Sequence, residues 1–567
     1  MTLNEFQTLL KKHKIEAYLV TRRNMFLTED ILPEENKIME LTGFTGSAAN
    51  LLVFQNKAVL FTDGRYEIQA KLETDPQQIQ VECVKGSDFF PWLEANCQNP
   101  KLKIHFNPWC WSAREYAAHS TDSSPAEFIA DKKELLGKLL SDNPVHVFPH
   151  EIKYCGISSD EKISQVVQRL KNKNLKAYLF TAADSVSWLF NLRSDALPDT
   201  PVLRAYSLVK DNGETTLFAD KTDCETAVPF SKLSAYLKKF KKQSLGLDLR
   251  TTPQEVLSFL ADNAYVHTPD LAAGEKAVKN PVELQGIKNA HLRDAAAMCN
   301  FLCWLDDNWQ GKTELDIVAK LRSFRESQKL FYSDSFPTIA GFGANGAIVH
   351  YQPKPHTNLE LKSGSMLLLD SGAQYFDGTT DITRTIAIGK PSAEMIKDFT
   401  TVLKCHITLA SALFPEKTSG NALDAICRHN LWQQGKNYNH GTGHGVGCFL
   451  NVHEGPQNLS SGASYYPLQP NMVNSVEPGY YKEGHYGIRI ENLVYVAKES
   501  DRNSEIPMLK FKYLTLVPID KRLIDKYLLS DGEINWLNIY HQTVYDKVSP
   551  LVDDRVKSWL KDACSPI

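Results

Sequence analysis

The stretch SMLLLDSGAQYFDGTTDITRTIAIG, residues 365–389, decides the fold class of the second half of this chain. It consists of two apolar strand segments separated by a turn at QYFDG. Asp370 ends the first segment and Asp381 opens the second, so a hairpin of this length can bring both carboxylates to one side. An acid at the end of an apolar strand costs free energy unless its charge is neutralised. The stretch therefore predicts a buried hairpin whose two acids need a positive partner.

Three further ligand candidates lie downstream of this hairpin. The segment NHGTGHGVGCFLNVHEG, residues 439–455, contains five glycines and three histidines, and its glycines leave backbone room for His444 to approach a centre closely. Glu477 lies in NSVEPGYY, and Glu491 lies in the apolar strand pattern YGIRIENLV. Four carboxylates would balance two divalent cations, and one imidazole would complete the set. Oxygen-rich ligation of this kind favours manganese or cobalt over a structural zinc.

Two glycine-rich motifs in the same region do not favour nucleotide binding. GFGANG, residues 341–346, fits the GxGxxG pattern, but that pattern needs a following helix, which Pro353 and Pro355 oppose. HGTGHGVG lacks the Lys-Ser/Thr end of a phosphate loop. His440 and His444 do not form an HExxH zinc motif either, because the residues between them would not hold a helix. We interpret His440 as structural support for the ligand His444.

The composition restricts the classes of partner. The chain has 567 residues, 43% of them hydrophobic, and a formal net charge of −4. The length predicts about three domains, and so small a charge argues against nucleic-acid or membrane-surface binding. Eleven cysteines without a CxxC pair, and an N-terminus without an apolar signal core, fit a reducing cytoplasm. We interpret the lysine-rich run YLKKFKKQ, residues 236–243, as the solvated side of an amphipathic helix.

The first half of the chain contains an internal echo. IEAYLVT, residues 15–21, is followed by AVLFTDGRY, residues 58–66, and LKAYLFT, residues 175–181, is followed by TTLFADKTD, residues 215–223. Each copy opens with a helix that leads into a strand. The echo predicts two related α/β domains that divide near residues 153–161.

The rest of the chain opens with helices and continues with strands. Asn280 precedes a proline and forms a capping box, which predicts a helix over residues 281–307, and Thr313 is the N-cap of a second helix. Strand patterns then dominate, apart from a helix over about residues 421–434. The last sixty residues have helical spacing of apolar positions and predict an amphipathic extension.

With these residues, and with the phrases DSGAQYFDGTTDITRT, HGTGHGVGCFLNVHEGP and EGHYGIRIENL, the chain resembles the pita-bread dinuclear metallopeptidases. Within that family it is most similar to the long, three-domain, cytosolic type of Xaa-Pro aminopeptidase (aminopeptidase P). The resemblance covers nearly the whole chain and implies an α/β (α+β) fold. Its expected parts are two creatinase-like α/β domains (1–157 and 158–279), a pita-bread catalytic domain (280–500) and an extension (501–567) on that domain or at a dimer interface.

The resemblance also implies roles for individual residues. Asp381 and Glu491 would bridge two divalent metal ions, Asp370 would bind one ion, and His444 and Glu477 would bind the other. The implied catalytic residues are His350, His453 and Glu477. The implied substrate-binding residues are Arg65, His350, His444, His453 and Arg489.

From the resemblance we expect an aminopeptidase that hydrolyses the N-terminal Xaa-Pro bond with a metal-bridged hydroxide as nucleophile. The expected metal is Mn²⁺, with Co²⁺ or Zn²⁺ as alternatives. The expected partners are peptides with proline at the second position and a second copy in a cytoplasmic homodimer, without nucleic acid or membrane. Two alternatives stay open, namely a prolidase restricted to Xaa-Pro dipeptides and a catalytically inactive, peptide-binding member of the fold.

Overall fold

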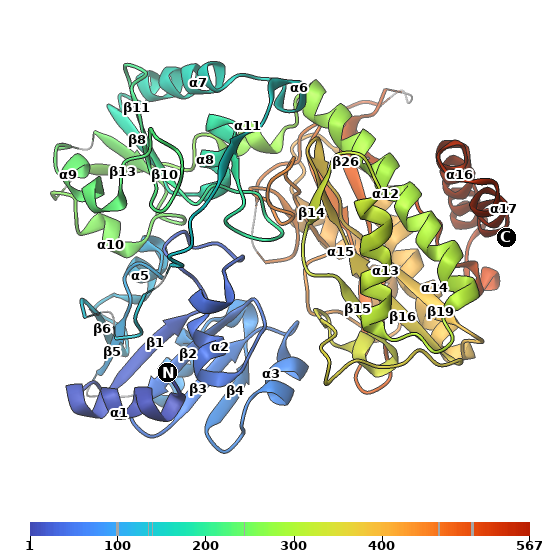
Figure 1. Cartoon of the computed structure of the whole chain (residues 1–567), viewed down its shortest axis with the longest axis horizontal. Coiled ribbons are helices and arrows are strands. Elements are labelled where there is room, and N and C mark those ends of the chain that lie inside the picture. The colour runs from blue at the N-terminus through green and yellow to red at the C-terminus, as the bar shows by residue number, and fades with distance from the viewer. Residues whose placement is uncertain are drawn as a thin grey trace. The chain divides into compact units, whose positions relative to one another are not determined.

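The computed structural model describes residues 1–97, 101–133, 135–138, 140–242, 244–262, 264–462, 465–500 and 504–567. These residues form two compact units. The first unit comprises Met1–Pro149, Ile157–Leu197 and Pro201–Ala272, and the second comprises His150–Gly156, Pro198–Thr200 and Ala273–Ile567. In Figure 1 the chain of the first unit runs from blue to green, and that of the second, apart from its two short segments before residue 201, runs from green to red.

The first unit begins with a six-stranded mixed sheet. Its order is β4 (Ile79–Cys83), β3 (Ala58–Thr62), β2 (Ala49–Phe54), β1 (Ala17–Thr21), β5 (Leu102–Phe106) and β6 (Ala126–Ala130). The accompanying helices are α1 (Leu3–His13), α2 (Lys37–Thr42), α3 (Glu67–Glu73), α4 (Phe90–Asn96) and α5 (Ala113–His119). Buried apolar side chains form one cluster with Phe6 and Leu51 and another with Phe61 and Phe106, so the strands are apolar on both faces.

A second sheet in the same unit repeats the topology of the first, without a strand that corresponds to β4. Its order is β11 (Thr215–Phe218), β10 (Tyr206–Lys210), β8 (Ala177–Phe180), β12 (Leu245–Leu247) and β13 (Tyr265–His267). The helices are α7 (Ser159–Asn172), α8 (Ala183–Phe190), α9 (Leu233–Leu237) and α10 (Gln254–Leu257), and β7 (Val147–Pro149) pairs with β9 (Leu192–Ser194). In both sheets the first strand pairs antiparallel with one neighbour and parallel with the other. The echoed segments are β1 and β8, then β3 and β11, so the internal echo reflects a repeated α/β module.

The helix expected over residues 236–243 is much shorter than its sequence pattern suggests. Helix α9 ends at Leu237, and the chain continues in turns, with the Phe240 amide donating to the Leu237 carbonyl. Four lysines in the five positions from Lys238 repel one another along a continued helix, and Lys242 has a φ of 52°. Gln243, the last residue of the run, lies outside the described residues.

The second unit contains the helices expected after Asn280. Helix α12 (Pro281–Asn308) has Asn280 as N-cap with a complete capping box, and α13 (Glu314–Glu326) has the same arrangement at Thr313, which confirms both predicted starts. Helix α15 (Gly420–Trp432) covers most of the helix expected near residues 421–434. The other helices are α6 (Ile152–Cys155), α11 (Ala273–Ala277), α14 (Ala393–Ala410), α16 (Asp531–Val548) and α17 (Asp554–Ala563).

The hairpin expected from residues 365–389 is present and lies at the centre of the second unit. Strands β16 (Ser365–Ser371) and β19 (Ile382–Ile388) pair antiparallel, with Asp370 opposite Thr383, and β15 (Ile339–Phe342) extends the sheet. Between them, β17 (Ala373–Tyr375) and β18 (Gly378–Thr379) form a small sheet with β14 (Phe331–Asp334).

A four-stranded sheet completes the second unit. Its order is β20 (Leu413–Pro415), β27 (Met508–Tyr513), β26 (Asn492–Lys498) and β23 (Val473–Val476). Short ribbons join β21 (Gly443–His444) to β22 (Asn458–Leu459) and β24 (Gly479–Lys482) to β25 (Tyr486–Arg489). One large apolar core includes side chains from the hairpin, from α12, α14 and α15 and from this sheet.

The C-terminal residues pack within the second unit as an amphipathic helical extension. Leu537, Tyr540 and Val544 of α16 are buried, as their helical spacing predicted. Helices α16 and α17 both contact α12, and Figure 1 shows them in dark red beside the C-terminus. The apolar faces of both helices join the large core of the unit.

The buried histidine His541 predicts a loss of stability in mild acid. Burial lowers its pKa from 6.5 to about 3, helped by the positive charges of Lys521 and Arg384. Its Nε2 accepts the Ile519 amide at 3.1 Å, so the folded protein holds it neutral. As the pH falls below 6.5, the histidine takes up a proton in the unfolded chain but not in the folded protein, and this difference favours unfolding. The free energy of unfolding is therefore reduced progressively between pH 7 and pH 3, by about 2 kcal/mol at pH 5.

We therefore expect His541→Gln to reduce the difference between the melting temperatures at pH 7 and pH 5. Glutamine offers an oxygen to the same amide and does not titrate. Differential scanning fluorimetry measures this difference, with His429→Gln at an exposed site as the control. An unchanged difference in the His541 variant would contradict this expectation.

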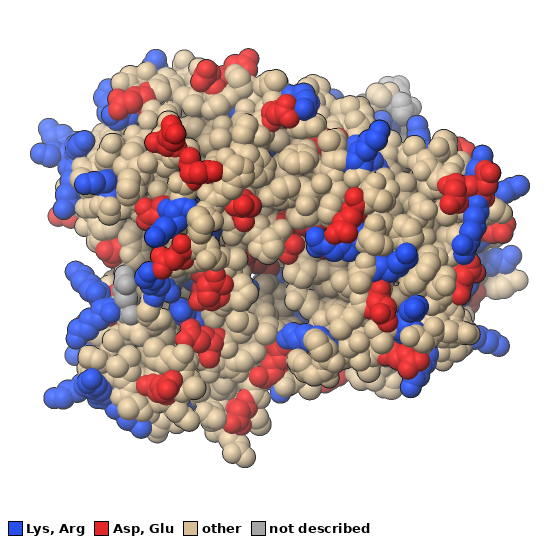
Figure 2. Space-filling view, viewed as in Figure 1, with Lys and Arg blue, Asp and Glu red and all other residues tan. Residues whose placement is uncertain are grey.

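The charged surface is mixed in sign. Figure 2 shows Lys and Arg side chains interspersed with Asp and Glu over most of the face in view. In the described part of the chain, no helix combines the length and the apolar character needed to span a membrane.

Candidate metal centre

The structure brings three of the five predicted ligands into one small cluster. Ligand atoms of Asp381, His444 and Glu491 all lie within 4.8 Å of one another. Asp381 comes directly before β19, His444 ends β21, and Glu491 lies between β25 and β26, so three separate ribbons contribute. Glu477 adjoins the cluster, because its Oε1 lies 3.4 Å from Nε2 of His444.

Asp370 lies beside the same group of acids, and its carboxylate accepts hydrogen bonds from Arg489. Asp370 is the last residue but one of β16 and lies opposite Thr383 of β19. Nη2 of Arg489 donates to its Oδ2 at 2.6 Å and Nε donates at 3.2 Å. Arg489 is only 1% exposed, so its charge acts at full strength on the neighbouring carboxylates.

His444 is oriented so that one nitrogen remains for a ligand. Its Nδ1 donates to the Gly445 carbonyl at 2.9 Å, and its Nε2 points to Asp381 Oδ2 at 3.5 Å and to Glu477. A ring with Nδ1–H has its free lone pair on Nε2, which is the atom a metal takes. The loop is fixed from α15, since Arg428 donates to the His440 carbonyl at 2.6 Å.

The electrostatics of the cluster favour a cation. Burial and the charge of Asp381 raise the pKa of Asp370 to about 7, although Arg489 opposes the shift. Burial and three neighbouring carboxylates also raise the pKa of Glu491 well above its ordinary value. Oδ1 of Asp370 and Oδ1 of Asp381 are buried without a hydrogen-bond partner. Unpaired, buried and mutually repelling oxygens beside an imidazole nitrogen fit divalent metal ions.

The predicted histidines outside the ligand set lie at different depths. The ring of His453 is 4.3 Å from that of His444, and its side chain is exposed to solvent. His350 follows Val349, whose carbonyl accepts a hydrogen bond from Arg489 at 3.2 Å. Glu314 holds the flanks of this loop, because it accepts the Phe342 amide at 2.7 Å and the Tyr351 hydroxyl at 2.9 Å.

His440 and Arg65 have contacts of other kinds. His440 Nε2 shares a hydrogen bond of 2.9 Å with the Tyr481 hydroxyl, which also accepts Arg489 Nη1 at 2.6 Å. Arg65 belongs to the first unit, where its Nη2 pairs with Oδ2 of Asp63 at 2.7 Å. Its substrate contact stays a prediction.

Several supporting residues were missed in the sequence. Thr383 Oγ1 donates to Glu491 Oε2 at 2.7 Å, and Ser475 Oγ donates to Glu477 Oε1 at 3.1 Å. Thr383 could have been found, because it is two residues from Asp381 and residues i and i+2 share a strand face. Nothing in the sequence pattern singled out Tyr481.

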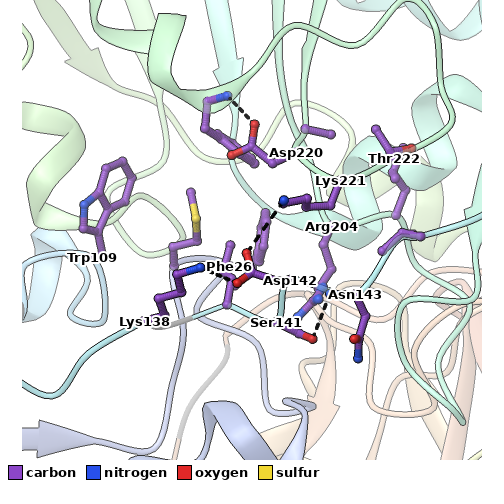
Figure 3. Close-up of a pocket in the computed structure, with 16 residues that line it drawn as sticks. Phe26, Trp109, Lys138, Ser141, Asp142, Asn143, Arg204, Asp220, Lys221 and Thr222 are labelled. Atoms are coloured by element: carbon purple, nitrogen blue, oxygen red, sulfur yellow. Dashed lines mark hydrogen bonds and ion pairs between the residues drawn. The ribbon is translucent and has the colours of Figure 1, made fainter.

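The first unit contains a separate cavity of about 260 Å³ that holds none of the predicted site residues. Figure 3 shows Asp142 between Lys138 and Lys221, and its carboxylate forms an ion pair with each of these lysines. Arg204 pairs with the buried Glu35 at 2.6 Å. The charged groups of these residues are therefore engaged with one another.

Comparison with known proteins places this site in a family. The model of metallopeptidase family M24 matches residues 285–498, and that of the C-terminal region of the same peptidases matches residues 507–567. Models of the creatinase/prolidase N-terminal domain match residues 3–130 and 141–283. A probable Xaa-Pro aminopeptidase P of Coprinopsis cinerea is 35% identical, over 100% of this chain and 98% of the relative. The chain belongs to metallopeptidase family M24, in its Xaa-Pro aminopeptidase group.

Solved structures agree with this assignment. X-prolyl aminopeptidase from Caenorhabditis elegans, described as a cytosolic enzyme with a di-nuclear active site, superimposes with a TM-score of 0.94 at 31% identity, covering 100% of this chain and 99% of the relative. Recombinant prolidase from Thermococcus sibiricus has a TM-score of 0.52 at 23% identity, covers 64% of this chain and 98% of its own, and shares the fold. The M24 membership and the mixed α/β architecture with creatinase-type N-terminal modules are therefore confirmed.

Proposed function

We propose that this M24 hydrolase is a metal-dependent aminopeptidase that removes the N-terminal residue of peptides with proline at the second position. The observation that carries the proposal is the cluster of Asp381, His444 and Glu491 within 4.8 Å. It occurs in a chain whose full-length relatives are named Xaa-Pro aminopeptidases. Prolidases share the fold over about two thirds of this chain, which makes the dipeptidase alternative the weaker one.

The proposed metal set consists of two divalent ions held by Asp370, Asp381, His444, Glu477 and Glu491. Two buried carboxylate oxygens without partners support it, as does the raised pKa of Asp370 beside them. Four oxygen ligands and one imidazole suit Mn²⁺, with Co²⁺ or Zn²⁺ as alternatives. Such ions, when bound, supply acidity to a water molecule and polarise a peptide carbonyl.

The residues of the chain would handle protons and position the substrate. A prolyl nitrogen carries no hydrogen in the peptide, so it must receive a proton as the bond breaks. We assign that transfer to Glu477, whose Oε1 is held by Ser475 and faces His444. We propose that His453, exposed beside His444, and His350 donate hydrogen bonds to the scissile carbonyl.

The position of Arg489 limits its proposed role. The guanidinium is buried and fully engaged with Asp370, Thr383, the Val349 carbonyl and Tyr481. It therefore orients Asp370 and the loop of His350, and we propose that its effect on substrate is indirect. Contact of Arg65 with substrate is proposed only from the family resemblance.

A test separates the aminopeptidase from its two alternatives. Metal-free protein is given Mn²⁺ and then an Xaa-Pro-Xaa tripeptide or an Xaa-Pro dipeptide, and released amino acids are quantified. We expect release of the first residue from the tripeptide. Turnover of the dipeptide alone would indicate a prolidase, and turnover of neither, together with no bound metal, would indicate an inactive binding member.

Location, assembly and domain limits are further parts of the proposal. A cytoplasmic location is supported by the relative from Caenorhabditis elegans, which is described as cytosolic. A homodimer through the C-terminal extension is supported by exposed apolar side chains at Tyr527, Ile539 and Leu551. The division into residues 1–157, 158–279, 280–500 and 501–567 is kept as a proposal, with its last boundary beside residues 501–503, which lie outside the described residues.

A further inference from the structure

The C-terminal region has no part in the chemistry proposed so far, yet it meets the metal centre at one buried arginine. Arg384 lies on β19, three residues after Asp381, and is 2% exposed. Residues Leu514–Ile519, which follow β27, and helix α16 pass beside it. Every nitrogen of its guanidinium donates at least one hydrogen bond.

The hydrogen bonds of Arg384 point in two directions. On one side, Nη1 donates to the Glu491 carbonyl at 2.7 Å and to the Thr383 carbonyl at 2.9 Å, while Nη2 donates to Oδ1 of Asn492 at 2.8 Å. On the other side, the acceptors are the Pro518 carbonyl at 3.1 Å, the Val517 carbonyl at 2.8 Å and the Tyr540 hydroxyl at 3.0 Å. One guanidinium therefore joins the strand of a ligand to the C-terminal region.

This arrangement depends on neutral acceptors. Among the described residues, no carboxylate lies within ion-pair distance of Arg384, and burial lowers its pKa, although the more distant charge of Glu491 opposes the shift. A buried cation without an anionic partner needs every available carbonyl and hydroxyl dipole, so the C-terminal acceptors are required rather than incidental. Because the guanidinium is planar and rigid, fixing one side of it also fixes the other.

Glu491 is held at three points. Thr383 Oγ1 donates to its carboxylate at 2.7 Å, its amide donates to the Thr383 carbonyl at 3.2 Å, and its own carbonyl accepts Arg384. All three contacts come from residues of β19, namely Thr383 and Arg384. The third contact also links Glu491 to the C-terminal region, because Arg384 donates further hydrogen bonds to Val517, Pro518 and Tyr540.

Tyr540 is itself fixed in place. Its ring stacks on Trp536 at 5.5 Å and meets Tyr513 edge to face at 5.3 Å. Its hydroxyl donates to the Val517 carbonyl at 2.9 Å while it accepts from Arg384. The hydroxyl therefore has little freedom to follow a displaced arginine.

We propose that the C-terminal region is part of the catalytic apparatus, in which Tyr540 and the carbonyls of Val517 and Pro518 hold Arg384, and Arg384 positions the ligand Glu491. Arg384 and Tyr540 are positioning residues, since neither belongs to the proposed metal ligands or substrate-binding residues. The inference rests on the proposed metal-dependent function. It gives the extension a role within one chain, separate from any part in a dimer.

The test uses Tyr540→Phe and Arg384→Lys in the full chain. Tyr545→Phe is the matched control, because this tyrosine lies on the same helix, is half-buried, and no hydrogen bond of its hydroxyl to the described residues is present. Isothermal titration of metal-stripped protein gives the dissociation constant for Mn²⁺, and tripeptide assays give kcat and KM. Circular dichroism shows whether each variant is folded.

We expect Tyr540→Phe and Arg384→Lys to weaken Mn²⁺ binding roughly 10- to 100-fold and to lower kcat, with KM nearly unchanged and Tyr545→Phe like the unaltered chain. A merely structural role would lower the number of binding sites without changing their dissociation constant. Dissociation constants equal to that of the unaltered chain in folded Tyr540→Phe would overturn the inference, whether or not Arg384→Lys folds. If the unaltered chain binds none of Mn²⁺, Co²⁺ and Zn²⁺, the proposed function fails, and the inference fails with it.

Discussion

Asp381→Asn is expected to lower kcat/KM for an Xaa-Pro-Xaa tripeptide by about 10³-fold or more while the metal-free protein becomes more stable. Activity is lost because an amide replaces a carboxylate that faces both His444 and Glu491. Metal ligation supplies several kcal/mol of charge stabilisation in the transition state. The stability of the metal-free protein rises because the negative charge of Asp381 repels those of Asp370 and Glu491 and raises the pKa of both. Removing one charge relieves that repulsion when no cation is present.

The two readouts are measured separately. Tripeptide assays at saturating Mn²⁺ give the activity, and scanning fluorimetry in the presence of a chelator gives the melting temperature. Relief of about 1 kcal/mol of carboxylate repulsion predicts a rise in melting temperature of roughly 2–4 °C. Asp554→Asn, at an exposed position of α17, controls for the chemical change. Near-normal activity of the Asp381 variant, or a lower melting temperature of its metal-free form, would contradict this account.

Glu454→Gln is expected to destabilise the second unit by about 3–5 kcal/mol, because it removes the buried carboxylate that forms ion pairs with two buried lysines. Lys276 Nζ lies 3.1 Å from Oε2 of Glu454, and Lys279 Nζ lies 3.2 Å from Oε1. All three side chains are at most 2% exposed. The Glu454 amide also donates to the Gly445 carbonyl at 2.8 Å, the acceptor that His444 Nδ1 uses, so the histidine loop should loosen.

Lys279→Met is the matched control for this prediction. It removes one cation and leaves Lys276 paired with Glu454, so we expect a clearly smaller loss of stability. Urea titration followed by tryptophan fluorescence compares the two variants, with Mn²⁺ affinity as a second readout. Equal stability of Glu454→Gln and Lys279→Met would show that the buried charge balance does not stabilise this loop.

The parts of the structure that follow local rules could be predicted from the sequence. The Asn280 and Thr313 caps determine helix starts by short-range hydrogen bonds, and both appear as expected. The hairpin of residues 365–389 was predictable, because an apolar segment that ends in an acid has few conformations of low free energy in water. The five ligand candidates are acids and a histidine in strand and glycine contexts, and these local contexts singled them out.

The parts that depend on distant contacts could not be predicted. Lys276 and Lys279 resemble solvent-exposed lysines in sequence, and only the fold brings Glu454 to them from 175 residues away. Arg384 likewise finds its acceptors at Val517 and Tyr540 in the C-terminal region. The lysine run after Leu237 failed as a helix for the opposite reason, since a periodic pattern can occur where charge repulsion opposes continuation.

The central claim is that this chain uses two metal ions, held by Asp370, Asp381, His444, Glu477 and Glu491, to cleave an N-terminal Xaa-Pro bond. The most direct measurement titrates metal-free protein with Mn²⁺ while following both bound metal per chain and the rate of release of the first residue from an Xaa-Pro-Xaa tripeptide. The account predicts no turnover without metal and a rate that saturates when two ions are bound per chain. Full turnover by metal-free protein, or saturation of binding without any cleavage, would contradict it.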